Sequence, residues 1–166
     1  MKKFFLSHKQ AHLFAFFATY FLVALALIIQ KKFNLEPCPL CITQRIIFMV
    51  LGLFFLINAF IKPTYLMRRL SLVILSITSI IGMVFSFKHM LIQSKAIDVP
   101  NECGVDLNYM FENFPFSKAL NLLFKGTGDC SHIDWTFLSL TLPELALIGF
   151  VSFFIYTVLL FWMNVK

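Results

Sequence analysis

The chain has 166 residues, of which 60% are hydrophobic, 17% aromatic and only 13% charged. Soluble proteins average roughly 45 to 50% apolar and about 25% charged residues, so this composition excludes a soluble globular protein and indicates an integral membrane protein. At this length the apolar segments must pack on one another, which predicts a single domain over residues 1–166.

Four apolar runs along the chain are long enough to cross a membrane, since a hydrocarbon core of about 30 Å needs about 20 helical residues. We predict an all-α bundle of four transmembrane helices, at roughly 11–29, 44–61, 68–88 and 144–163. Ala24-Leu25-Ala26 is similar to a signal-peptidase site, but it lies inside the first apolar run. An uncleaved first helix is therefore expected.

Two loops, roughly 30–43 and 89–143, lie on the same side of this predicted bundle. The second is long and contains an apolar stretch between Leu107 and Phe124. Ser117 is a suitable N-cap for a short helix ending at Phe124. Its apolar side chains would contact membrane lipid in the headgroup region as an interfacial helix.

The charges divide by side of the membrane. The termini and the turn after the second helix carry only basic residues, namely Lys2, Lys3, Lys9, Lys62, Arg68, Arg69 and Lys166. All 8 acidic residues fall on the side of the two loops. By the positive-inside rule both termini are predicted to be cytoplasmic and both loops periplasmic. The net charge of +6 therefore reflects topology and does not indicate nucleic-acid binding.

The four cysteines, Cys38, Cys41, Cys103 and Cys130, all fall on the outward side. Disulfides persist outside the cytosol, so two disulfides are predicted. Of the three possible connectivities, the adjacency of Cys38 and Cys41 favours Cys38–Cys41, which leaves Cys103–Cys130. A zinc site made of the four cysteines is disfavoured because such sites usually combine two closely spaced pairs, so no metal is expected.

The Cys-x-x-Cys spacing of Cys38 and Cys41 is typical of catalytic or labile disulfides. A Cys103–Cys130 bond taken alone would be interpreted as a structural brace worth about 3 to 4 kcal/mol. Beside the Cys-x-x-Cys pair it is interpreted as a second redox couple. Both interpretations of the long-loop pair remain open from the residues alone.

Polar residues accompany the Cys-x-x-Cys pair. The start of the second helix and Arg45, one turn after Cys41, would both stabilise a Cys41 thiolate, although Arg45 could instead be an interfacial anchor. His89, expected at the same depth after the third helix, is either an interfacial side chain or a proton donor to a reducible carbonyl. Gln44 and Gln93 carry no individual signal.

Pro37-Cys38-Pro39-Leu40-Cys41 followed by Gln44-Arg45 resembles the signature of the DsbB family of bacterial disulfide bond formation proteins. The resemblance extends over most of the chain, through His89, Gln93, Cys103, Gly128-Asp129-Cys130, Trp135 and the segment Phe137–Glu144. It implies an inner-membrane oxidoreductase that reoxidises a DsbA-like periplasmic thiol oxidase and passes two electrons to a quinone, either ubiquinone or menaquinone. Periplasmic disulfide bond formation would be sustained in this way.

The resemblance also implies residue roles. The partner would attack Cys103, the released Cys130 would exchange with Cys38, and Cys41 would become the thiolate that contacts the quinone. Arg45 would position and polarise the quinone, with His89 nearby. Two alternatives are a DsbI-like sister enzyme that serves a dedicated partner, and a non-catalytic four-helix membrane protein whose disulfides only brace its outer loops.

Overall fold

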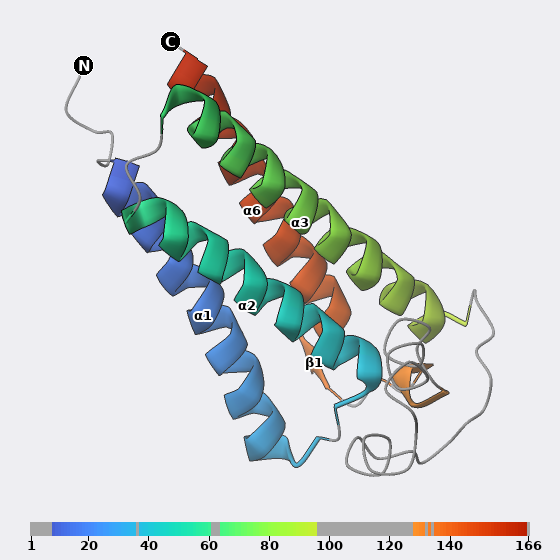
Figure 1. Ribbon diagram of the computed structural model, residues 1–166. Coiled ribbons are helices and arrows are strands. Elements are labelled where there is room, and N and C mark those ends of the chain that lie inside the picture. The colour runs from blue at the N-terminus through green and yellow to red at the C-terminus, as the bar shows by residue number, and fades with distance from the viewer. Residues whose placement is uncertain are drawn as a thin grey trace, which may run out of the picture.

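The computed structural model describes residues 8–35, 37–60, 64–95, 128–131, 133 and 135–165. Within them, four long helices form a bundle (Figure 1): α1 His8–Phe33, α2 Pro39–Phe60, α3 Tyr65–Gln93 and α6 Leu142–Val165. All four helices are long and apolar enough to cross a membrane. The predicted all-α fold of four transmembrane helices is confirmed, while the predicted interfacial helix ending at Phe124 lies outside the described residues.

The two ends of the bundle differ. The start of α1, the end of α2, the start of α3 and the end of α6 lie at one end (Figure 1). The opposite end gathers the other four helix termini and η1, a short 3₁₀ helix at Gly128–Ser131. The helices therefore bring the Cys-x-x-Cys segment and the segment of Cys130 to the same end.

All four helices extend further than predicted at this end. α1 ends at Phe33 rather than at residue 29, and α6 begins at Leu142 rather than at residue 144. α2 begins at Pro39 rather than at residue 44, because proline at the first helical position already has the required φ and needs no N–H partner. The Ile42 N–H donates to the Cys38 carbonyl at 3.3 Å, which makes Cys38 the N-cap. α3 continues to Gln93 rather than ending at residue 88, so His89 is a helical residue.

A small hairpin precedes α6 where an irregular loop was predicted. Its strands, β1 Thr136–Phe137 and β2 Leu140–Thr141, pair antiparallel around Leu138 and Ser139, whose φ values are 51° and 67°. Positive φ at both central residues is the geometry of a type I′ turn. Trp135 beside β1 lies 6.1 Å from Phe33 between ring centroids, so the hairpin packs against the end of α1.

The centre of the bundle is held by close aromatic packing. Phe48 of α2 and Phe150 of α6 stack with ring centroids 3.9 Å apart. Gly82 of α3 lies directly against the Phe150 ring, and Gly149 of α6 lies against Phe48. Small residues at such positions let membrane helices approach closely, which fixes the relative placement of α2, α3 and α6.

Candidate functional site

Cys38 lies at the N-terminus of α2. The Cys41 backbone N–H donates to the Cys38 sulfur at 3.4 Å, which is the bond that a capping side chain accepts from the third helical residue. The N–H groups and dipole of a helix N-terminus favour negative charge. The sequence predicted that the helix N-terminus would stabilise a thiolate at Cys41, which lies in the first turn of α2. In the structure, the sulfur that accepts the N-terminal hydrogen bond belongs to Cys38.

The imidazole of His89 joins Cys38 to Gln44. His89 Nε2 lies 3.5 Å from the Cys38 sulfur, and His89 Nδ1 lies 3.4 Å from the amide nitrogen of Gln44. His89 and Gln44 are only 1% and 5% exposed. Because an amide nitrogen can only donate, this arrangement leaves Nδ1 as the acceptor and places the proton of the neutral imidazole on Nε2. The N–H of His89 then faces the Cys38 sulfur and is also hydrogen-bonded to the backbone of Cys130, so N–H groups of both α2 and α3 lie against the Cys38 sulfur.

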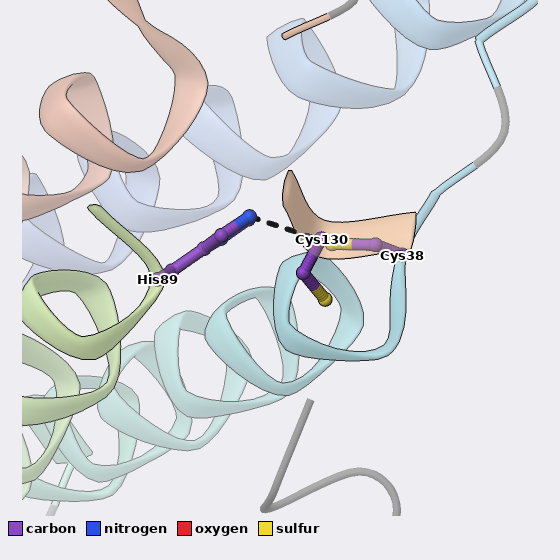
Figure 2. Close-up of side chains that lie close together, drawn as sticks. All are labelled: Cys38, His89 and Cys130. Carbon is purple, nitrogen blue, oxygen red and sulfur yellow. Dashed lines mark hydrogen bonds between the residues drawn. The ribbon is translucent and has the colours of Figure 1, made fainter. Parts of the chain in front are cut away.

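Cys130 of η1 completes a cluster of three buried side chains. The Cys38 sulfur, a His89 ring nitrogen and the Cys130 sulfur all lie within 4.8 Å of one another. Figure 2 shows the three side chains converging from α2, α3 and η1. Buried Leu40 and Ile92 pack with the two cysteines in one apolar cluster, which holds η1 against the ends of α2 and α3.

The cluster changes the protonation of Cys38. Hydrogen bonding to Cys130 raises the pKa of the Cys38 thiol well above its ordinary value, and hydrogen bonding to Cys41 and burial raise it further. The N–H groups at Cys38 favour its thiolate, but the neighbouring sulfurs outweigh them when all three cysteines are reduced. Cys38 therefore keeps its proton when all three cysteines are reduced. Because Cys130 raises the pKa of Cys38 most and is carried by η1, the size of this effect depends on the position of η1.

The Arg45 side chain reaches Gln30 of α1 and stays within electrostatic range of Cys41 and Cys38. Its guanidinium donates a hydrogen bond to the side-chain oxygen of Gln30. Gln30 also lines an open surface hollow of about 510 Å³ at the end of α1, together with Leu27, Lys31, Asn34 and Leu35. Arg45 is thus held beside a hollow on the outer surface of the bundle, and Gln30 is a site residue that no motif in the sequence indicated.

The structure brings together some of the predicted site residues. Cys38, His89 and Cys130 meet, Cys41 adjoins Cys38, and Arg45 lies one turn after Cys41, within electrostatic range of it. Cys38 and Cys41 carry free thiols, so the Cys38–Cys41 disulfide stays a prediction for the oxidised protein. Cys103 lies outside the described residues, and the Cys103–Cys130 disulfide likewise stays a prediction.

A four-helix membrane bundle that gathers Cys38, Cys41 and Cys130 around a histidine at one end defines a class, the multi-pass membrane thiol–disulfide oxidoreductases. The family described as "Disulfide bond formation protein DsbB" matches residues 8–161. The chain belongs to the DsbB family. It is a membrane enzyme of disulfide bond formation.

Curated relatives agree with this assignment. "Disulfide bond formation protein B" of Methylobacillus flagellatus is 45% identical over 152 residues, 92% of each chain. The protein of the same name from Methylococcus capsulatus is 40% identical over 142 residues, covering 85% of this chain and 86% of the relative. That of Nitrosococcus oceani is 37% identical over 140 residues, covering 82% and 83%.

Proposed function

We propose that this chain reoxidises a DsbA-like periplasmic thiol oxidase and passes the two electrons to a membrane quinone. One observation carries the proposal: the Cys38 sulfur lies between Cys41 of its own helix and Cys130 of η1. Cys38 can therefore exchange with either cysteine. Such a shared sulfur is what an electron path from a loop disulfide to a helix-bound disulfide requires.

The thiol steps balance as a series of thiol–disulfide exchanges followed by one oxidation. A thiolate of the reduced partner attacks Cys103, the Cys103–Cys130 bond breaks, and Cys130 leaves as a thiolate. Cys130 attacks Cys38, forming Cys38–Cys130 and releasing the Cys41 thiolate. The second thiol of the partner then attacks the partner sulfur in the mixed disulfide, which forms the partner disulfide and frees Cys103. Cys103 attacks Cys130, which re-forms Cys103–Cys130 and releases Cys38 as a thiol. The Cys38–Cys41 bond re-forms when the quinone takes up the two electrons and two protons of this dithiol. The net reaction converts a partner dithiol and a quinone into a partner disulfide and a hydroquinone.

Residues around the cluster support particular steps. The N–H groups of His89 and Cys41 point at the Cys38 sulfur, the atom that Cys130 attacks. Arg45 follows Cys41 by one helical turn and provides a fixed positive charge for the anion that develops on a quinone oxygen. In this proposal the quinone ring binds beside Arg45, next to the open surface hollow that Gln30 lines.

The proposal includes the orientation. Among the described residues, the helix ends opposite the cysteine cluster carry Lys9, Arg68 and Arg69 without an acidic residue. The cluster end carries both signs, including Lys31, Lys32, Arg45, Lys88, Lys95 and Glu144. Basic residues collect on the cytoplasmic side of membrane proteins. We therefore place the termini in the cytoplasm and the cysteines in the periplasm, with the bundle in the bacterial inner membrane.

The test is quinone reduction by the purified protein in detergent, with reduced DsbA as donor. Cys38→Ser and Cys41→Ser should each abolish turnover, whereas Ser152→Ala, which removes an exposed hydroxyl from α6, should not change it. Retained turnover in either cysteine variant would refute the electron path and favour the interpretation in which the disulfides only brace the loops. Turnover with a different thiol oxidase but not with DsbA would favour a dedicated partner.

A further inference from the structure

We propose that the reduced protein binds one thiophilic divalent cation, Zn²⁺ in the first place, through Cys38, His89 and Cys130. The three ligand atoms come from three separate elements and lie within 4.8 Å of one another (Figure 2). Their side chains are 8%, 1% and 1% exposed. The inference does not rest on the proposed electron path, because it requires only these three side chains in their reduced form.

The distances suit zinc. Bonds of about 2.3 Å to sulfur and about 2.0 to 2.1 Å to nitrogen at tetrahedral angles place neighbouring sulfur and nitrogen ligands roughly 3.5 Å apart. The Cys38 sulfur and His89 Nε2 are already 3.5 Å apart. The remaining pairs are at most 4.8 Å apart, so a shift of η1 by about 1 Å closes the site.

The charge also suits a buried site. Binding replaces the protons of the Cys38 and Cys130 thiols, so two protons leave and no electron moves. Two thiolates and a neutral imidazole cancel the double charge of Zn²⁺, which avoids an uncompensated charge in an apolar environment. Thiolate and imidazole ligands select zinc-like ions over Mg²⁺ and Ca²⁺, which prefer oxygen.

Gln44 is placed to support such a ligand. Ligation through Nε2 moves the imidazole proton of His89 to Nδ1. Gln44 can then turn its amide so that the oxygen accepts this proton at the position where the nitrogen now lies, 3.4 Å away. Metal-bound histidines characteristically donate their second N–H to such a group.

The site has a functional consequence. Three protein ligands leave the fourth position to water or an incoming thiol. Cys38 cannot be both a zinc ligand and half of a disulfide, so only the reduced protein binds the ion. Bound Zn²⁺ therefore holds the enzyme in its reduced form and stops turnover until the ion is removed.

The experiment uses the full untagged chain in detergent, reduced anaerobically and freed of reductant. Titration with Co²⁺ should give one equivalent bound, with the visible bands of four-coordinate cobalt and a sulfur-to-cobalt charge-transfer band, both abolished by Zn²⁺. Cys130→Ser and His89→Ala should each weaken Zn²⁺ binding by about 100-fold, because each variant removes a direct ligand. Removing a residue that only hydrogen-bonds a ligand already costs roughly 10- to 100-fold in affinity. Cys41→Ser is the matched control and should keep both the spectrum and the affinity.

Absence of the charge-transfer band, or its persistence in Cys130→Ser and His89→Ala, would overturn the site. The oxidised wild-type chain provides a comparison that needs no variant, and equal binding by the oxidised and reduced chains would also refute it. Quinone reduction is measured separately. Turnover without metal binding rejects only the metal site, whereas metal binding without turnover supports the site and rejects only the proposed electron path.

Discussion

At the scale of single residues, chemistry depends on pairs that no local motif reveals. The Cys-x-x-Cys pattern identified Cys38 and Cys41, and the even cysteine count added Cys130. The contact between His89 and Gln44 links residues 45 positions apart and exists only because α2 and α3 pack together. Gln30 and Arg45 are brought together in the same way by α1 and α2. These partners could not be predicted from spacing within one helix.

Gln44→Leu should slow turnover about tenfold while leaving the KM for quinone unchanged. The change removes the amide that orients His89 toward the Cys38 sulfur, and outer partners of this kind typically contribute 10- to 100-fold. Steady-state kinetics with a DsbA-like donor would separate kcat from KM. Thr43→Val, which removes a neighbouring buried hydroxyl bonded to its own helix at Pro39, should behave like the wild type. Equal loss in both variants would mean that Gln44 only fills space.

Arg45→Ala should raise the KM for quinone about tenfold, which corresponds to one hydrogen bond to a charged group at roughly 1.5 kcal/mol. Gln30→Leu should raise it by less, since it only frees the guanidinium from its partner on α1. In both variants, thiol exchange between the partner and the chain should be unchanged. The exchange is measured by trapping the mixed disulfides. An unaltered quinone KM in Arg45→Ala would assign Arg45 to interfacial anchoring instead.

At the scale of elements, apolar length predicted the four helices but not their outer ends. α2 continues through Thr43, Gln44 and Arg45 because each of these polar residues has a partner within the protein. The Thr43 hydroxyl donates to the Pro39 carbonyl of its own helix, whereas Gln44 and Arg45 contact α3 and α1. The hairpin was missed because its type I′ turn uses Leu138 and Ser139, without the glycine or asparagine that normally indicates one. The start of α6 is clearer in retrospect: Glu144 accepts from the Thr141 N–H at 2.6 Å, as in a capping box.

Gly82→Leu should destabilise the bundle by about 1 to 3 kcal/mol, the usual cost of overpacking. A side chain at Gly82 would collide with the Phe150 ring, which is fully buried and stacked on Phe48. Thermal unfolding in detergent would show a lower Tm. Val84→Leu on the exposed side of α3 is the matched control and should leave the Tm unchanged. A Tm for Gly82→Leu equal to that of the control would show that α3 and α6 can separate without cost.

At the scale of the whole molecule, the bundle has two different ends. Among the described residues, one end carries basic residues without acidic ones and the other carries the sulfur cluster, and orientation decides which compartment each end faces. Composition and charge alone predicted this separation, because membrane length and the positive-inside rule act on whole segments rather than on side-chain contacts. The meeting of Cys130 with Cys38 needed the structure, since it depends on where η1 docks. An electron path to a periplasmic partner further requires that this end face outward.

Single reporter cysteines can test the orientation in a background where the four native cysteines are replaced by serine. Leu138→Cys in the hairpin and Leu66→Cys at the start of α3 are matched, because the two leucines are 81% and 76% exposed and lie at opposite ends. In intact spheroplasts a membrane-impermeant maleimide should label the first and not the second, while permeabilised cells should show both labelled. The reverse pattern would place the sulfur cluster in the cytosol, where thiols are kept reduced, and would remove the basis for exchange with a periplasmic partner.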